Sequence, residues 1–206
     1  SWRYLDNGSD QGNAWRAVGF NDATWQSGPA QLGYGDGDED TELEFGGDSS
    51  NKYATTYFRS TFNVTDAADL TSINLRLVYD DGAAIYLNGA EFFRSSNMAS
   101  NMSYSEYTVG GDDTPSEDFQ RFDGLSPDLL VEGENTIAVE IKQGDAGSSD
   151  ISFDMGLIGV KTVVAKPLLL TSPGRAVLSS RVKDGEEWSA LTRAAFLVDS
   201  EPVDTS

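Results

Sequence analysis

Hydrophobic and polar residues alternate along several separate stretches of the chain. In residues 73–79 every odd position is apolar, while Asn74 and Arg76 between them are polar. A period of two places one face of a β-strand on a core. The same period recurs in residues 137–141 and 151–157, so we expect β-strands in all three stretches.

Short turn signals connect the expected strands. Asn88-Gly89 separates residues 83–87 from residues 90–94, and an Asn-Gly pair supplies the two positive-φ residues of a type I′ hairpin turn. Asp80-Asp81-Gly82 is expected to turn the chain just before this hairpin.

Three segments together predict the fold class: TTYFRSTFNV (55–64), LRLVYDDGAAIYLNGAEFFR (75–94) and LLVEGENTIAVEI (129–141). They are typical of a strand, a hairpin and a closing strand in an all-β, antiparallel jelly-roll β-sandwich. They resemble the galactose-binding-like, sugar-binding module that many secreted bacterial glycoside hydrolases carry as a non-catalytic accessory. AWRAVGFNDATWQSGPAQLGYGDGD (14–38) resembles the opening of that family. The resemblance implies a binding or spacer role, by analogy of fold.

Two regions are expected to be irregular. Residues 1–34 read as loop-rich wrapping in which Phe20 and Trp25 plug the core, since large aromatic side chains are usually buried. Residues 95–124 form the longest irregular stretch. Long loops are uncommon in compact domains, so this stretch is either a functional rim or an elaborated strand connection.

The composition changes beyond about Val163. Residues 168–198 read as strand, loop, strand, an Asp184-Gly185 turn and a last strand. This segment resembles the closing half of the fibronectin-like or chitobiase C-terminal-like repeat found downstream of such jelly rolls. We therefore expect a galactose-binding-like domain in residues 1–163, a partial β-repeat in 164–200 and a linker in 201–206.

Charge and composition narrow the classes of function. The 206 residues include 34 acidic and 14 basic side chains, giving a net charge of −20. Such a surface repels nucleic acid and an anionic membrane leaflet and attracts hard cations. The chain has no run long enough to span a membrane as an apolar helix. It has no Cys or His, which removes thiol chemistry and the commonest general base.

The same composition bears on the origin of the chain. Ser1 is not an initiator Met, which suggests a piece of a longer precursor. Twenty-one Gly, 11% aromatic residues and no Cys fit a secreted or cell-surface bacterial module better than a eukaryotic ectodomain, which would more often use disulfides.

Calcium is the expected cofactor, because relatives of the galactose-binding-like fold often hold one structural Ca²⁺. Seven carboxylates crowd residues 36–48, and Ca²⁺ takes six to eight oxygen ligands. The loop begins like an EF-hand but has Thr41 at the sixth place and Gly47 at the twelfth. The alternative is a set of solvated turn carboxylates. The candidate ligands are Asp36, Asp38, Asp40 and Asp150.

Sugar binding needs an aromatic plane and a few convergent polar groups. The aromatic residues outside clear strand-core positions are Trp15, Tyr34, Tyr53, Tyr104 and Tyr107. Tyr34 and Tyr53 flank the acidic loop, so the alternative for these two is that they pack the loop down.

The main hypothesis is a non-catalytic, extracellular carbohydrate-binding accessory module of a larger bacterial protein. Its partners would be a polysaccharide or glycan and the neighbouring domains of the parent chain. The rival hypothesis is a structural spacer without a glycan ligand. A third is a standalone hydrolase with paired carboxylates, but the sequence marks no pair over another, and no catalytic residue is assigned.

Overall fold

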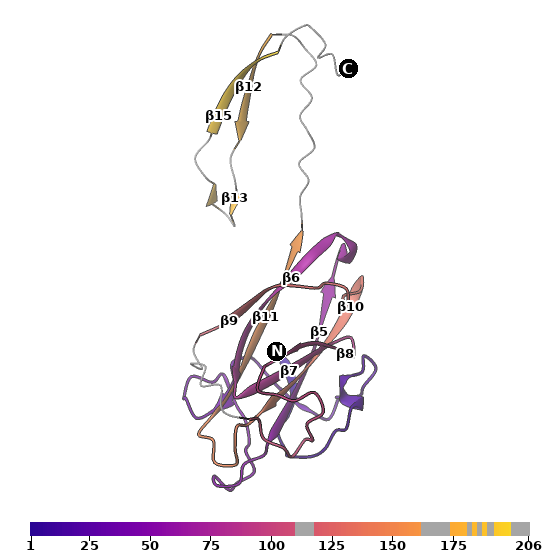
Figure 1. The fold of residues 1–206 in the computed structure, drawn as a ribbon, viewed down its shortest axis with the longest axis vertical. Helices are drawn as coiled ribbons and strands as arrows, with labels where there is room; N and C mark the ends of the chain where they lie inside the picture. The colour runs from indigo at the N-terminus through magenta and orange to yellow at the C-terminus, as the bar shows by residue number, and fades with distance from the viewer. Residues whose placement is uncertain (110–117, 162–173, 181–182, 185–186, 189–191, 199–206) are drawn as a thin grey trace. The chain divides into compact units, whose positions relative to one another are not determined.

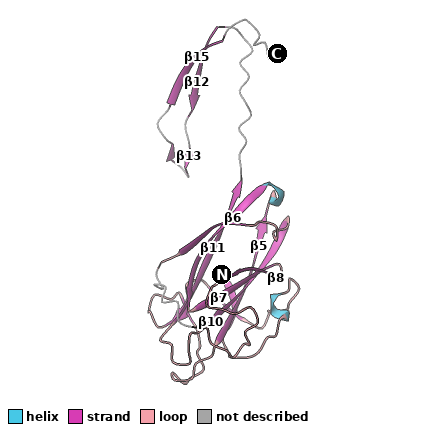
Figure 2. Ribbon diagram, in the orientation of Figure 1, coloured by secondary structure: helices cyan, strands magenta, loops and turns pink. Residues whose placement is uncertain are grey.

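A computed structural model describes residues 1–109, 118–161, 174–180, 183–184, 187–188 and 192–198. The chain divides into two compact units, Ser1–Thr162 and Val163–Ser206, which are described separately. Strands dominate both units (Figure 2), and the described helices are two 3₁₀ turns, η1 (Ala14–Arg16) and η2 (Ala67–Asp69). Within the described ranges, no helix has the length and apolar character needed to cross a membrane.

The first unit is a sandwich of two β-sheets (Figure 1). The six-stranded sheet has the order β2 (Gln26–Gly28), β1 (Trp2–Leu5), β5 (Thr55–Val64), β10 (Gly133–Lys142), β7 (Gly82–Leu87) and β8 (Ala90–Arg94). The five-stranded sheet has the order β4 (Thr41–Glu42), β3 (Leu32–Tyr34), β11 (Ile151–Lys161), β6 (Leu70–Asp80) and β9 (Gln120–Leu125). Every pair of neighbouring strands is antiparallel except β3 and β4. The predicted all-β, antiparallel sandwich is confirmed.

The main core fills the space between the two sheets. Phe58 on β5 packs on Phe153 on β11, with ring centroids 4.4 Å apart. Leu75 and Leu77 are fully buried, as the alternating pattern predicts. The predicted inward positions of β10, Ile137, Val139 and Ile141, are also buried.

The six-stranded sheet is buried on its outer face as well. Side chains of neighbouring strand positions point to opposite faces, so Tyr57 and Ala138 lie opposite the main core. They form a second cluster with Trp15, Trp25, Ala84, Tyr86 and Met98. Trp25 is therefore a core plug, as expected, and Phe20 packs half-buried against its ring at 5.7 Å.

Two regions expected to be irregular contain strands. In the region 1–34, β1 pairs with β5, and β2 and β3 extend one sheet each. In the region 95–124, β9 pairs with β6. These strands are short, or carry exposed residues on both faces, so alternation along the sequence is too brief or too polar to reveal them.

Of the two predicted turns, one forms a hairpin and the other connects the two sheets. Asn88 (φ 51°) and Gly89 (φ 87°) connect β7 to β8, which confirms the predicted hairpin. Asp80-Asp81-Gly82, by contrast, carries the chain from β6 in one sheet to β7 in the other. The two Asp residues therefore lie where the sheets are bridged, and not at a solvent-exposed hairpin tip.

The described residues of the second unit form two pairs of antiparallel strands. β12 (Gly174–Ser180) pairs with β15 (Thr192–Val198), and β13 (Lys183–Asp184) pairs with β14 (Glu187–Trp188). Gly185 of the expected turn, the strand expected near 168–170 and the expected linker 201–206 lie outside the described residues.

Candidate functional site

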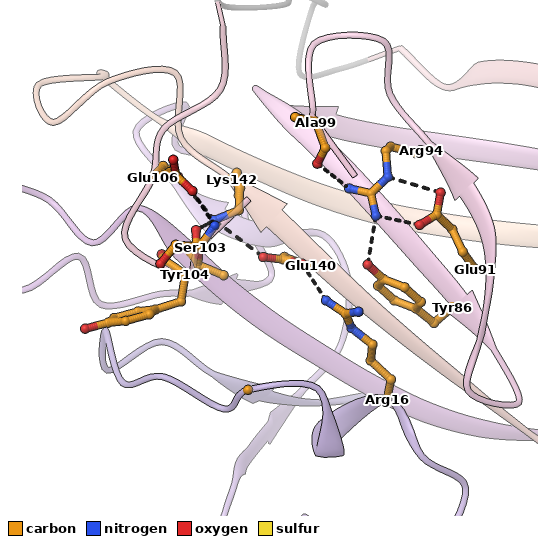
Figure 3. Close-up of polar contacts among 12 residues, drawn as sticks. Arg16, Tyr86, Glu91, Arg94, Ala99, Ser103, Tyr104, Glu106, Glu140 and Lys142 are labelled. Atoms are coloured by element: carbon orange, nitrogen blue, oxygen red, sulfur yellow. Dashed lines mark hydrogen bonds and ion pairs between the residues drawn. The ribbon is translucent and has the colours of Figure 1, made fainter. Parts of the chain in front are cut away.

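Lys142 anchors the irregular segment 95–109 to the outer face of the six-stranded sheet. Lys142 ends β10 and its side chain is fully buried on the outer face of the six-stranded sheet. Its ammonium donates to the Thr55 hydroxyl at 2.7 Å, to the Ser103 carbonyl at 2.8 Å and to the Glu106 carbonyl at 3.1 Å (Figure 3). One buried cation thus holds the polar part of this segment, next to Met98 and Met102, which pack into the second apolar cluster.

Tyr104 lies between the two loop carbonyls that Lys142 binds. The Thr55 hydroxyl donates to the Tyr104 carbonyl at 2.6 Å, and the Tyr107 hydroxyl donates to the Lys52 carbonyl at 2.9 Å. The backbone around Tyr104 is therefore fixed, while its side chain is 36% exposed. An exposed aromatic ring on a fixed backbone costs little conformational entropy on binding.

Two shallow hollows flank Tyr104, and we call this surface the Tyr104 rim. The first hollow, of about 160 Å³, is lined by Asp10, Gly12, Asn13, Trp15, Arg16, Tyr57, Met102, Ser103, Tyr104 and Glu140. The second, of about 180 Å³, is lined by Gly8, Asn51, Lys52, Tyr53, Ala54, Thr55, Tyr104, Ser105 and Tyr107. Tyr104 is the aromatic residue that both hollows share.

Charged groups line the floor of the first hollow. Glu140 lies between Arg16 at 3.7 Å and Lys142 at 3.4 Å. The Arg16 guanidinium also stacks 4.1 Å from the centroid of the Tyr86 ring. Burial lowers the pKa of Lys142, and the nearby Glu140 opposes that shift.

A second cation fixes the start of segment 95–109. Arg94 donates to Glu91 at 2.6 and 3.1 Å, to the Tyr86 hydroxyl at 3.0 Å and to the Ala99 carbonyl at 3.2 Å (Figure 3). The hydrogen bond from Arg94 holds the pKa of Glu91 below its usual value, although partial burial raises it. Arg94 and Lys142 together tie both ends of the segment to the sheet.

The structure brings four of the five predicted sugar-binding aromatic residues to the Tyr104 rim. Tyr53, Tyr104 and Tyr107 line the second hollow, and Trp15 lines the first. Trp15 is nevertheless fully buried, with its ring 4.8 Å from that of Tyr57, so its face is covered by protein. The fifth residue, Tyr34, lies elsewhere.

Tyr34 is buried in the core and does not reach the rim. Its ring packs 5.2 Å from that of Phe45 and 4.9 Å from the Lys52 ammonium. Phe45 belongs to the acidic loop. Tyr34 therefore packs this loop against the sandwich, which is the alternative to a sugar-binding role. The Tyr53 ring likewise lies against the backbone of Gly8 and Gly46, where a Cβ atom would collide with it.

The predicted metal ligands divide between two places. Carboxylate oxygens of Asp36, Asp38 and Glu39 lie within 4.8 Å of one another, and the first two side chains are exposed. Glu39 accepts hydrogen bonds from the backbone amides of Asp36 and Gly37. Neither Asp40 nor Asp150 belongs to this group.

Asp150 instead lies beside two buried carboxylates, Asp80 and Asp81. Burial, and after it the charges of Asp81 and Asp150, raise the pKa of Asp80 to about 9. Sequence reasoning missed Asp80 and Asp81 because it assigned them to a turn. The available signal was their position directly after the inward-facing Tyr79.

A larger hollow, of about 440 Å³, lies away from the Tyr104 rim. It is lined by Ser1, Trp2, Arg3, Asp22, Ser27, Arg59, Ser60 and Thr61. Its Arg59 is already paired with Asp22 at 2.8 Å, and Trp2, its aromatic residue, is 9% exposed. This hollow therefore presents no aromatic plane to a ligand.

Comparison with known proteins gives likenesses to solved structures only. No family model matches the chain, and no curated protein matches it. Among solved structures, a Bacteroides uniformis β-glucuronidase 2 is 13% identical over 98% of this chain and 26% of that chain, with a TM-score of 0.48. A calcium binding mutant of the same enzyme is 14% identical over 98% and 26%, with a TM-score of 0.43.

A more distant match is the β-D-mannosidase from Dictyoglomus thermophilum, 26% identical over 43% of this chain and 9% of that chain, with a TM-score of 0.29. The chain thus covers about a quarter or less of the protein chain in each of these three structures. TM-scores this low assign no role to it.

Proposed function

We propose that the chain is a non-catalytic, carbohydrate-binding accessory module of a larger, secreted or cell-surface bacterial protein of the glycoside hydrolase type. One observation carries the proposal: Tyr104 is exposed on a backbone fixed by Lys142, between two hollows lined by aromatic and polar groups. Such a surface offers an aromatic plane for the apolar face of a sugar and polar groups for its hydroxyls.

The shape of the Tyr104 rim favours an extended glycan over an enclosed single sugar. Both hollows are open and smaller than the roughly 300–1,000 Å³ typical of pockets that enclose a small ligand. A chain of sugars lying across Tyr104 would reach polar groups in both hollows. Among these are Asn13 on one side and Asn51 on the other.

Calcium belongs to the same proposal as a structural cofactor of the acidic loop. Asp36 and Asp38 would supply carboxylate oxygens together with Glu39, which lies beside them in place of Asp40. Oxygen donors of this kind suit Ca²⁺.

The second candidate function is a structural spacer without a glycan ligand. The observation in its favour is that two of the five predicted sugar-binding aromatic residues, Trp15 and Tyr34, are buried by the protein itself. A spacer requires a rigid sandwich and no binding surface.

Binding to a panel of polysaccharides by glycan array and affinity electrophoresis separates the two functions. We expect retention of the full chain on at least one glycan. Tyr104→Ala should weaken that retention roughly 30-fold, the equivalent of about 2 kcal/mol for a central aromatic contact. Phe119→Ala is the matched control, because Phe119 is also 36% exposed but lines neither hollow.

Two results would count against the carbohydrate proposal. If the chain is retained on no glycan, the spacer is favoured. If Phe119→Ala weakens retention as much as Tyr104→Ala does, binding does not occur at the Tyr104 rim.

A further inference from the structure

Glu140 is a nearly buried carboxylate that lines an open hollow. Its side chain is 7% exposed, and it is one of the residues around the first hollow of the Tyr104 rim. It lies on β10 two positions before Lys142, so both side chains point to the outer face of the six-stranded sheet. A buried carboxylate requires compensating charges and hydrogen bonds. The groups around Glu140 therefore decide what this hollow can bind.

Two cations compensate the charge of Glu140 but leave its oxygens able to accept hydrogen bonds. Lys142 lies 3.4 Å from one carboxylate oxygen. An ammonium has three hydrogens, and Lys142 has three closer acceptors, at 2.7, 2.8 and 3.1 Å. Arg16 lies 3.7 Å from the other oxygen (Figure 3), which is longer than a hydrogen bond. Glu140 therefore keeps the capacity to accept a hydrogen bond from a ligand.

Arg16 keeps donors at the same hollow. A guanidinium has five N–H groups. The Nε atom of Arg16 has no acceptor among the described residues, and the ion pair with Glu140 is too long to be a hydrogen bond. The side chain is nevertheless held in place, because the guanidinium stacks 4.1 Å from the centroid of the Tyr86 ring. Arg16 is 25% exposed and lines the hollow, so it presents donors from a fixed position.

The charges around the first hollow favour a neutral ligand over an anionic one. Its lining contains two carboxylates, Asp10 and Glu140, and one cation, Arg16. An anionic group attracted to Arg16 would also meet both carboxylates, and like charges brought together at an interface oppose binding. A hydroxyl group offers one hydrogen and two lone pairs. It can therefore donate to Glu140 and accept from Arg16 without introducing a charge.

We propose that Arg16 and Glu140 are specificity-determining residues of the Tyr104 rim, which select a neutral glycan over one that carries carboxylate or sulfate groups. The two residues bind sugar hydroxyls as a donor and an acceptor, while Tyr104 provides the apolar contact. This inference rests on the proposed carbohydrate-binding function and names the class of glycan that the rim takes.

Affinity electrophoresis of the full chain, at constant ionic strength, tests the preference with matched pairs of polysaccharides. The pairs are hydroxyethyl cellulose with carboxymethyl cellulose, methyl-esterified pectin with its demethylated form, and dextran with dextran sulfate. We expect the neutral member of a pair to retain the wild type at least about 10-fold more strongly than the anionic member.

Arg16→Met tests the donor. We expect the variant to lose retention on the neutral glycan about 10-fold or more, as the loss of a hydrogen bond from a charged group does. Arg16→Lys keeps the charge beside Glu140 and is the second variant if Arg16→Met fails to fold. It should also weaken retention, because an ammonium lacks the planar fork of a guanidinium.

Glu140→Gln tests the acceptor. The substitution keeps the size of the side chain and removes its charge, so an anionic glycan meets less repulsion in the hollow. We expect the preference for the neutral member to fall several-fold. Asp10→Asn removes the other carboxylate of the hollow and should lower the preference in the same way if Glu140→Gln fails to fold.

Arg121 and Asp123 provide matched controls. They form an ion pair of similar length, 3.6 Å, on β9 and line neither hollow. Arg121→Met and Asp123→Asn make the same changes of charge as the test variants and should leave both retention and preference unchanged.

The outcomes separate this inference from the function on which it rests. Retention by none of the polysaccharides contradicts carbohydrate binding itself. If retention depends on Tyr104 but the anionic member retains the chain as strongly as the neutral one, the preference is wrong and the binding function stands. The same conclusion follows if Arg16→Met binds the neutral glycan as well as Arg121→Met does.

Discussion

A single buried cation, Lys142, holds the backbone on both sides of Tyr104. Lys142 makes three hydrogen bonds and an ion pair with Glu140 while completely buried. A buried charge is tolerated only when its partners are all in place. The position of Tyr104 therefore depends on a residue that neither touches solvent nor belongs to the loop.

Lys142→Met tests this dependence. The substitution keeps most of the side-chain volume but leaves the Ser103 and Glu106 carbonyls without their donor, and Glu140 without one of its two cations. We expect the free energy of unfolding, measured by urea denaturation, to fall by about 3–5 kcal/mol.

Lys161→Met is the control for Lys142→Met. Lys161 pairs with Asp66 and Asp69 at the surface, where its side chain is 38% exposed, and such pairs contribute about 0–1 kcal/mol. Equal losses in the two variants would show that Lys142 has no special structural role.

At the scale of elements, the sequence predicts long strands and tight turns well and short or polar strands poorly. The apolar positions that alternate from Ile73 to Leu77 in β6 and from Ile137 to Ile141 in β10 are buried, and the Asn88-Gly89 turn is local chemistry. β1 and β9 pair with strands far away in sequence, β5 and β6. Their own residues do not encode that pairing, because the pairing of such a strand is specified by the strand beside it.

Gly89→Ala measures how much the hairpin depends on its turn. Gly89 has φ +87°, and an added Cβ would meet nothing closer than 3.7 Å, so the cost comes from backbone conformation alone. We expect a loss of about 1–2 kcal/mol in the free energy of unfolding, measured by chemical denaturation.

Gly19→Ala serves as the comparison for Gly89→Ala, because Gly19 has no positive φ and open space around it. Its effect should lie within about 0.5 kcal/mol of zero. If the two variants have the same stability, the turn at Asn88-Gly89 is not conformationally demanding.

For the candidate sites too, the sequence predicts which residues lie in loops but not which of them the fold brings together. Sequence placed Tyr53, Tyr104 and Tyr107 in loops, and the structure gathers them at one hollow. The sequence did not distinguish Trp15 and Tyr34, whose rings the protein covers, from these three tyrosines. Nor did it show that Asp80 and Asp81 are buried, because their burial arises when two sheets meet over the crossing between them.

At the scale of the whole molecule, the net charge of −20 opposes compaction by self-repulsion. This effect is long-ranged, so it should respond to any salt. Raising NaCl from 10 to 150 mM shortens the screening length from about 30 to about 8 Å. We expect the melting temperature of the metal-free chain, followed by circular dichroism, to rise over this range.

Salt screening should raise the melting temperature of Asp38→Asn as much as that of the wild type, because one exposed charge fewer changes the overall field little. A melting temperature that does not respond to NaCl would mean that the acidic surface is already neutralised, and that repulsion does not limit the stability of the sandwich.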